Sequence, residues 1–274
     1  MENYRAVATR IAGFPALQST VDTTNPTLLF LHGAFVGHEP FEPWMEYFAK
    51  RGWRSVAASR RGRAGVGPKH AKGLKIADYI DDTMAVIDAL KEKPILVGHS
   101  LGGLIAQKIA ERDKAAGLIL LCPAPAARLP AQPIALPTYL PMFPKILAGQ
   151  PILPGPNGCS TIALNQIPTA DRAAIHKALV HESGAVYREL IFGSVKADFS
   201  KIVCPTMVIG GREDRIVAPA LVEWTAAQLK TKAHIYDGHA HWLLGEPGWE
   251  AIADDVFRFV SNLSSGLRLY AIAS

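Results

Sequence analysis

The chain has 274 residues, with 29 lysines and arginines against 24 aspartates and glutamates, 49% hydrophobic residues and 19% charged residues. This hydrophobic content and modest net charge exclude a disordered chain. A chain of this length forms one large α/β domain or two small ones. It buries roughly three quarters of its unfolded surface, so it needs no disulfide or metal to stabilise the fold.

The excess of positive charge does not indicate a particular binding partner, because lysine and arginine are spread along the sequence. The one dense group, Arg60, Arg61 and Arg63, is expected to be a solvated loop, and no nucleic-acid-binding signature accompanies it. The first ten residues lack an apolar signal core, and no run approaches the roughly 18 apolar residues of a membrane span. We therefore expect a cytoplasmic protein with no nucleic-acid partner and no membrane span.

Cysteine usage gives no sign of a disulfide or metal framework. Cys122, Cys159 and Cys204 are odd in number and form no CxxC pair. Cys122 and Cys204 stand in apolar runs and are expected to be small core residues in a reducing compartment. No HExxH motif occurs either, so the sequence implies neither a metal nor a cofactor.

Short apolar runs alternate with helical patterns along the first half of the chain. The predicted elements are a strand at 27–32, a helix at 41–51, a strand at 53–58, a helix at 76–90, a strand at 95–97, a helix at 101–112 and a strand at 117–122. In the helix at 76–90 the apolar residues recur at intervals of three and four. This alternation, with strands that are apolar at nearly every position, predicts an α/β fold with a mostly parallel, doubly wound sheet covered on both faces.

A proline-rich segment interrupts this rhythm after Cys122. Between Pro123 and Pro168 lie eleven of the 20 prolines, among scattered large apolar residues. Proline fixes φ and removes a hydrogen-bond donor, so this stretch forms neither sheet interior nor one long helix. We therefore predict that a segment of about 125–200 is inserted into one α/β domain made of 1–124 and 201–274.

The second half of the chain resumes the alternating pattern. One or two helices are predicted over 169–189, followed by a strand at 205–209, a helix at 219–229, a strand at 233–236 and a helix at 248–262. The tail at 263–274 carries no assignment.

A G-x-S-x-G pattern, Gly98-His99-Ser100-Leu101-Gly102, lies between the strand at 95–97 and the helix at 101–112. A serine at such a sharp turn has strained dihedrals, and its hydroxyl lies at a helix N-terminus, where negative charge is favoured. Strand and helix come too close there for side chains at the flanking positions, which accounts for the two glycines. The pattern alone is weak, but its place after a predicted strand makes Ser100 a candidate nucleophile.

A serine nucleophile needs a base, and the base needs a group that orients it. On this scaffold the expected order is serine, then an acid, then histidine, each after a later strand. Glu213 and Asp214 follow the strand at 205–209, and His239 and His241 follow the strand at 233–236. Both pairs lie at the carboxyl ends of strands, where ligand sites occur in open α/β sheets.

The sequence resembles the α/β-hydrolase fold family from about residue 28 to residue 260. The matching segments are His32-Gly33-Ala34, Gly98 to Gly103, Gly211 to Asp214, and His241 with Glu246-Pro247 five positions later. The resemblance implies that Asp214 is the acid and His241 the base. It also implies an oxyanion hole formed by the backbone N–H groups of Ala34 and Leu101, each worth roughly 3–4 kcal/mol.

The resemblance gives the neighbouring residues lesser roles. Glu213 is expected to face solvent or to pair with Arg212 or Arg215, and His239 to pack in a loop near the pocket. His32 and His99 are expected to be structural. The loop Ser59-Arg60-Arg61-Gly62-Arg63 departs from the pattern Asp-x-x-Gly-His-Gly of many relatives, and it is expected to support the site.

The insertion at 125–200 resembles the cap that many family members place over the active site. Its apolar residues are expected to line a pocket, with Phe35, Tyr139, Phe143 and Trp242 as candidate substrate-binding residues. The predicted function is that of a serine hydrolase that cleaves an ester, lactone or thioester of a small to medium apolar substrate through an acyl-enzyme. C–C bond hydrolases, acyltransferases, lyases and perhydrolases on the same fold remain alternatives, as does a non-catalytic small-molecule receptor.

Overall fold

The computed structural model describes residues 6–63 and 65–273, with side chains as far as residue 265. An eight-stranded sheet runs through it in the order β1-β2-β4-β3-β5-β6-β9-β10. β1 (Ala6–Ile11) and β2 (Phe14–Ser19) are antiparallel. The other six strands are parallel to one another: β3 (Leu28–Leu31), β4 (Ser55–Ala58), β5 (Ile95–His99), β6 (Gly117–Leu121), β9 (Thr206–Gly211) and β10 (Ala233–Tyr236). The predicted α/β fold with a mostly parallel sheet is confirmed.

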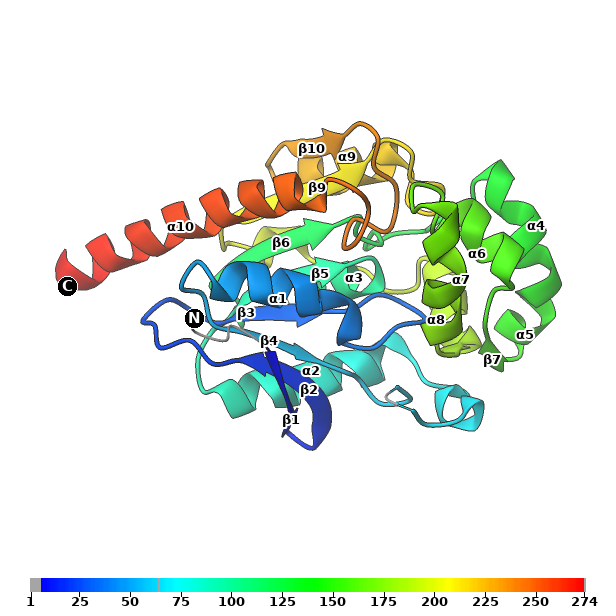
Figure 1. Cartoon of the computed structure of the whole chain (residues 1–274), viewed down its shortest axis with the longest axis horizontal. Coiled ribbons are helices and arrows are strands. Elements are labelled where there is room, and N and C mark those ends of the chain that lie inside the picture. Colours follow the sequence, from blue (N-terminus) through cyan, green and yellow to red (C-terminus); the bar gives the residue numbers. More distant parts are fainter. Residues whose placement is uncertain (1–5, 64, 274) are drawn as a thin grey trace.

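Helices cover both faces of the sheet, as Figure 1 shows. α1 (Glu42–Ala49) and α10 (Trp249–Ala273) pack on one face, while α2 (Ile76–Leu90), α3 (Leu101–Ala110) and α9 (Pro219–Gln228) pack on the other. Alternate side chains of each strand enter opposite clusters: in β3, Leu28 and Phe30 meet α1 and α10, whereas Leu29 and Leu31 meet α2 and α3. Strands buried on both faces explain the nearly continuous apolar runs in the sequence.

Two features at the ends of the chain were not predicted. The hairpin of β1 and β2 turns through Ala12 and Gly13, both with positive φ, and β1 is an edge strand whose residues are half-buried or exposed. The apolar signal of such a strand is weak, and its turn lacks the usual Asn-Gly pair. At the other end, α10 continues through the unassigned tail as far as Ala273.

The insertion between β6 and β9 consists of short helices. They are α4 (Leu136–Tyr139), α5 (Phe143–Leu147), α6 (Pro156–Ile162), α7 (Thr169–Ala178) and α8 (Gly184–Phe192), with a small sheet formed by β7 (Pro151–Ile152) and β8 (Glu182–Ser183). Proline occupies a first or second position in α4, α5 and α6. Proline is tolerated there because the first N–H groups of a helix have no internal acceptor, so each proline begins a new helix rather than extending the last.

The insertion lies beyond the carboxyl ends of the parallel strands, whereas α10 extends past the opposite end of the sheet (Figure 1). Along the sheet, β3 has β4 on one side and β5 on the other, so the connections that leave β3 and β5 diverge. Such a divergence opens the crevice in which α/β proteins bind ligands. The loops after β3, β5, β9 and β10 therefore meet beneath the insertion. No helix in the described part of the chain has the length and apolar character that a membrane span requires.

Candidate active site

Ser100 occupies a strained turn between β5 and α3. Its φ is 54° and its ψ is −119°, a combination that costs a non-glycine residue roughly 1–3 kcal/mol. The turn is tight: a Cβ on Gly98 would lie 2.5 Å from the carbonyl oxygen of Gly102, and one on Gly102 would lie 2.0 Å from that of Leu31. Neither position has room for a side chain, as the G-x-S-x-G pattern predicted.

Ser100, His241 and Asp214 form a continuous hydrogen-bonded chain. The Ser100 Oγ lies 3.0 Å from His241 Nε2, and His241 Nδ1 lies 2.8 Å from Asp214 Oδ2. All three residues are buried. With the Nδ1–H donated to the carboxylate, Nε2 keeps a lone pair that accepts the Ser100 hydroxyl proton. The arrangement can therefore remove a proton from the hydroxyl as it attacks an electrophile.

Asp214 is held by backbone donors on its other oxygen. Its Oδ1 accepts the N–H groups of Ile216 at 2.7 Å and Val217 at 2.9 Å, in the loop after β9. These bonds fix the orientation of the carboxylate. Its neighbour Glu213 is half-buried, and the prediction that Glu213 pairs with Arg212 or Arg215 is wrong: Arg212 pairs with Asp237, and Arg215 donates to the carbonyl of Thr161.

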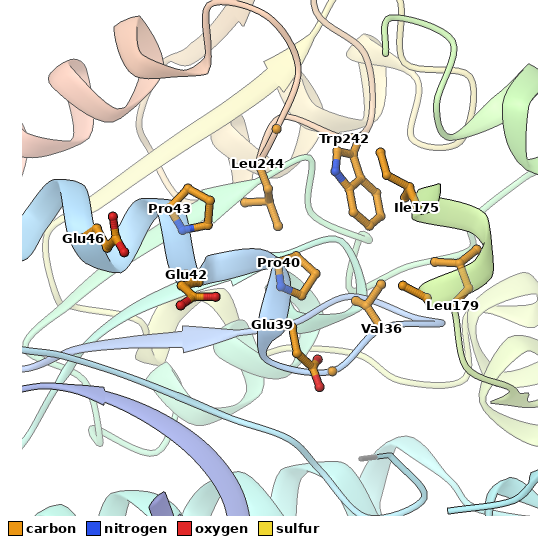
Figure 2. Close-up of a pocket in the computed structure, with 13 residues that line it drawn as sticks. Val36, Glu39, Pro40, Glu42, Pro43, Glu46, Ile175, Leu179, Trp242 and Leu244 are labelled. Carbon is orange, nitrogen blue, oxygen red and sulfur yellow. The ribbon is translucent and has the colours of Figure 1, made fainter. Parts of the chain in front are cut away.

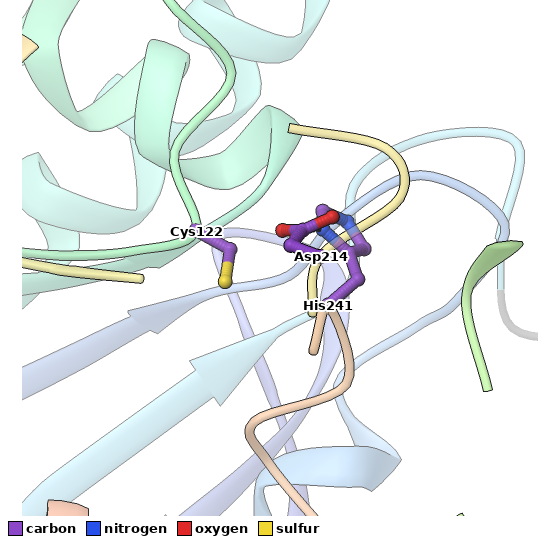
Figure 3. Close-up of side chains that lie close together, drawn as sticks. All are labelled: Cys122, Asp214 and His241. Carbon is purple, nitrogen blue, oxygen red and sulfur yellow. Dashed lines mark hydrogen bonds and ion pairs between the residues drawn. The ribbon is translucent and has the colours of Figure 1, made fainter. Parts of the chain in front are cut away.

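Cys122 lies beside the Asp214–His241 pair, and the possible ligand atoms of the three side chains are within 4.8 Å of one another (Figure 3). Burial raises the pKa of the Cys122 thiol well above its usual value, and the nearby Asp214 carboxylate raises it further. A metal ligand would have to be a thiolate. Both Asp214 oxygens are also already hydrogen-bonded. The three side chains therefore suit a site in which Asp214 orients His241 better than they suit a metal site.

Glu246 fixes the loop that carries His241. Its buried carboxylate accepts the N–H of Ala240 at 2.8 Å and that of Trp242 at 3.1 Å, the residues on either side of His241. Burial raises the pKa of Glu246. His239 lies against the same carboxylate at 3.3 Å, with its ring edge-on to Tyr236. The structure thus brings His241 rather than His239 to Ser100, and it gives a physical reason for a glutamate five positions after the histidine.

The backbone N–H groups of Ala34 and Leu101 lie near Ser100, and neither has an acceptor in the described part of the chain. Leu101 begins α3, so its N–H has no partner within the helix. Ala34 follows Gly33, and a Cβ on Gly33 would lie 3.2 Å from the Ser100 Cβ. The loop after β3 therefore passes directly against the serine, and both groups are available to a negatively charged oxygen.

His99 is a neutral structural histidine behind Ser100. Its Nε2–H donates to the carbonyl oxygen of His241 at 2.8 Å. Burial, with the neighbouring His241 as a smaller cause, lowers the pKa of His99 to about 3. Burial and the charges of Arg60 and Arg63 lower the pKa of His32 well below its usual value too.

These two histidines predict a loss of stability in acid. Between pH 6.5 and about 3 the unfolded chain binds a proton at position 99 that the folded protein excludes. The neutral histidine therefore contributes to the free energy of unfolding above pH 6.5. This contribution is lost as the pH falls, by about 1.4 kcal/mol per pH unit for each such histidine. We expect His99→Gln to lose distinctly less unfolding free energy between pH 7 and pH 5 than the wild type, measured by urea denaturation. Equal losses in both, with the exposed His70→Gln as control, would contradict this.

The Ser100 hydroxyl faces a small cavity of about 40 Å³. Of the predicted substrate-binding residues, Phe35, Tyr139 and Trp242 line it. Phe143 does not: it is 37% exposed and lines a neighbouring hollow. The cavity is also lined by Leu179, Tyr187 and Ile216, which the sequence did not predict. They come from the end of α7, from α8 and from the loop after β9, and no local pattern distinguishes them from ordinary core residues.

Two larger hollows adjoin this cavity. One, here called the apolar hollow, has about 130 Å³ and shares Tyr139, Tyr187 and Ile216 with the cavity. The other, here called the acidic hollow, has about 680 Å³ and shares Leu179 and Trp242 with it. Figure 2 shows the acidic hollow with Trp242 and Leu179 on one side and three glutamates on the other, Glu39, Glu42 and Glu46.

The prediction of a solvated basic loop at Arg60 to Arg63 is wrong for two of its arginines. Arg60 is 4% exposed and Arg63 is 2% exposed, whereas Arg61 lies at the surface and donates to Asp82. Arg63 forms a buried ion pair with Glu182 of the insertion. The sequence around position 60 shows no sign of these partners, because they come from the loop after β3 and from β8.

A mostly parallel sheet with a serine at a strained strand-to-helix turn, hydrogen-bonded to a histidine and an aspartate from later strand ends, is the architecture of α/β hydrolases. The chain belongs to the alpha/beta hydrolase family, which it matches over residues 28–255.

Individual relatives agree with this. The chain is 26% identical to the non-heme chloroperoxidase of Burkholderia pyrrocinia over 246 residues, which cover 79% of this chain and 85% of that protein. Its fold is similar to the monoacylglycerol lipase of Paleococcus ferrophilus, with a TM-score of 0.67, 20% identity and coverage of 91% of this chain and 98% of that one. It is also similar to an N-acyl homoserine lactonase, with a TM-score of 0.69, 19% identity and coverage of 94% and 97%.

Proposed function

We propose that this protein is a serine hydrolase that cleaves carboxylic esters of apolar acids, lactones and thioesters included. The observation that carries the proposal is the hydrogen-bonded chain from Ser100 through His241 to Asp214. The serine oxygen attacks the substrate carbonyl carbon while His241 Nε2 accepts its proton and passes it to the leaving group. Water then attacks the acyl-enzyme by the same route in reverse, which releases the acid and restores the serine hydroxyl.

The remaining residues have supporting roles in this mechanism. Asp214 holds the imidazole with its Nδ1–H towards the carboxylate and stabilises the imidazolium that forms after proton transfer. The N–H groups of Ala34 and Leu101 donate to the oxygen that becomes negatively charged in the tetrahedral intermediate. Neither role requires a metal or a cofactor, which agrees with the occupied oxygens of Asp214.

The cavity and the two hollows beside it support separate binding places for the acyl chain and the leaving group of the substrate. The cavity at Ser100 is small, so an acyl chain of more than a few carbons would have to extend past Tyr139 and Tyr187 into the apolar hollow. The leaving group would lie towards Trp242 and the acidic hollow, whose carboxylates disfavour an anionic leaving group. Tyr139, Leu179 and Tyr187 all belong to the insertion, which supports a cap role for it.

The first experiment combines covalent labelling with turnover. We expect a fluorophosphonate to modify Ser100, as mapped by peptide mass spectrometry, and p-nitrophenyl esters to be hydrolysed by the same preparation. Lactone and thioester panels then rank the bond types. A folded protein that neither labels nor turns over any of these substrates would contradict the proposal, and binding without turnover would favour a small-molecule receptor.

A chain-length series tests the assignment of the apolar hollow. We expect kcat/KM to rise by up to about fourfold per methylene over a few carbons, since each buried methylene contributes about 0.8 kcal/mol, and to fall once the hollow is full. Replacing Tyr139 and Phe143 together by alanine should flatten this profile while Ser100 still reacts with a small fluorophosphonate. Leu147→Ala, on the same exposed side of the insertion but outside the hollow, is the control. The same profile in all three proteins would reject the assignment.

Perhydrolysis is a second candidate, favoured by the similarity to a non-heme chloroperoxidase. Hydrogen peroxide would then replace water as the nucleophile that attacks the acyl-enzyme, and the product would be a peroxy acid. An assay with acetate, hydrogen peroxide and bromide would detect it through oxidation of the bromide, and Ser100→Ala would abolish the signal.

A further inference from the structure

Arg60 is a buried cation whose guanidinium pairs with no carboxylate among the described residues. Burial lowers the pKa of Arg60 to about 10, which still leaves it charged at neutral pH. Its guanidinium carbon lies 5.0 Å from the Tyr79 ring centroid, and its Nε and Nη1 have no partner in the described part of the chain. The carboxylates of Glu182 and Asp82 offset part of the cost of burying this charge from beyond ion-pair distance, but a buried charge without a direct partner remains costly.

Among the described residues, Nη2 is the guanidinium nitrogen of Arg60 that is hydrogen-bonded, and it faces the loop after β3. Arg60 Nη2 donates to the carbonyl oxygen of His32 at 2.8 Å and to that of Gly33 at 3.2 Å. The neutral His32 ring adds a third bond. His32 Nδ1 lies close to two of these atoms, 2.9 Å from Arg60 Nη2 and 2.8 Å from the Gly33 carbonyl oxygen. With the proton on Nδ1, Nε2 accepts the backbone N–H of Arg60 at 3.3 Å and the Nδ1–H donates to the Gly33 carbonyl. In this tautomer the Gly33 carbonyl accepts two hydrogen bonds, one of them from the charged guanidinium.

That carbonyl belongs to the same peptide group as the Ala34 N–H. The peptide bonds of the described chain are all trans, so the C=O of Gly33 and the N–H of Ala34 point in opposite directions. Because the carbonyl points at Arg60, the N–H points away from it. Gly33 itself packs against the Ser100 Cβ, so the peptide group lies between the buried guanidinium and the serine.

We propose that Arg60 is a positioning residue for the oxyanion hole, which orients and polarises the Gly33–Ala34 peptide so that the Ala34 N–H donates more strongly to the developing oxyanion. The inference rests on the proposed serine hydrolase mechanism.

The proposed effect belongs to the transition state. Hydrogen bonds to the carbonyl of a peptide strengthen the donor at its other end by about 10–30% per bond, and a positive charge in a buried setting adds to the potential behind that donor. The substrate carbonyl carries little charge before attack, whereas the oxygen of the tetrahedral intermediate carries a full one. Arg60 therefore acts on kcat and on the reaction of Ser100, and it has little effect on KM.

The test compares Arg60→Met and Arg60→Lys with Arg61→Gln, a control in the same loop whose side chain is 43% exposed. The readouts are the second-order rate constant for modification of Ser100 by a small fluorophosphonate, kcat and KM for p-nitrophenyl acetate, and Tm. Removing a direct oxyanion donor costs about 100- to 1,000-fold. For Arg60→Met, which acts through the peptide, we expect a fall of roughly tenfold or more in kcat and labelling, with KM within about twofold.

The variants also separate this role from a structural one. Methionine removes the unpartnered Nε and Nη1, so Tm should change by only a few degrees although the rates fall. Arg60→Lys keeps a cation and a donor and should recover most of the rate, and Arg61→Gln should react like the wild type. If Arg60→Met does not fold, Arg60→Gln takes its place.

Three results would overturn the proposal: wild-type rates in the neutral variant, equal losses in the lysine and neutral variants, or a change confined to KM. Wild-type protein that does not label at Ser100 would instead reject the underlying mechanism, so the two failures are distinguishable.

Discussion

Ser100→Ala is expected to reduce turnover of a chromogenic ester by three orders of magnitude or more, with the fold unchanged. The substitution removes the attacking oxygen, and loss of such a nucleophile typically leaves only the residual catalysis of the oxyanion hole and binding. Alanine retains the Cβ and the strained φ of 54°, and the lost hydroxyl leaves one hydrogen bond to His241 unmade. The change in unfolding free energy should therefore stay within about 1–2 kcal/mol.

The measurement is steady-state hydrolysis together with far-ultraviolet circular dichroism and Tm. Ser265→Ala, an exposed serine on α10, serves as the matched control. Retention of more than about a tenth of wild-type activity in Ser100→Ala would show that another group is the nucleophile.

His241→Ala is expected to be about as damaging as Ser100→Ala, because the two side chains transfer one proton between them. For the same reason the double variant should be little worse than either single variant, since residues that act as a unit do not have additive effects. His239→Ala should lose far less activity. Its ring bonds to Glu246 rather than to Ser100, so its loss is expected to lower Tm more than kcat.

The histidine comparison is made on kcat/KM and on the rate of fluorophosphonate labelling. A His241→Ala variant as active as the wild type, together with an inactive His239→Ala variant, would reverse the assignment. Equal, moderate losses in both would indicate that the loop held by Glu246 has moved, which a shared fall in Tm would reveal.

The elements that the sequence predicted best are those whose signal is local. β3, β5 and β6 are buried on both faces, so nearly every position in them is apolar. The glycines on either side of Ser100 indicate that the strand and helix backbones approach each other closely there. The assignment of His241 depended on its spacing to Glu246, and the two hydrogen bonds from Glu246 to the neighbouring N–H groups explain that spacing.

The features that the sequence did not predict depend on partners far away in the chain. Arg63 is buried because it pairs with Glu182, which lies 119 positions later in the chain. Arg60 is buried because two backbone carbonyl oxygens accept hydrogen bonds from its guanidinium. A run of arginines looks the same in a sequence whether or not such partners exist. The position of Phe143 outside the Ser100 cavity likewise depends on how α4 and α5 pack, which an apolar, proline-rich sequence leaves open.

The buried pair of Arg63 and Glu182 constrains how the insertion can move. Glu182 also accepts the Tyr79 hydroxyl at 2.6 Å, so β8 is fastened to the core by charged and neutral hydrogen bonds that water does not reach. Breaking the Arg63–Glu182 pair would leave two charges exposed to water or buried without a partner. In contrast, α4 and α5 present apolar side chains to solvent and form no comparable ion pair among the described residues. Any movement of the insertion is therefore expected to be smaller at β8 than at its α4–α5 end.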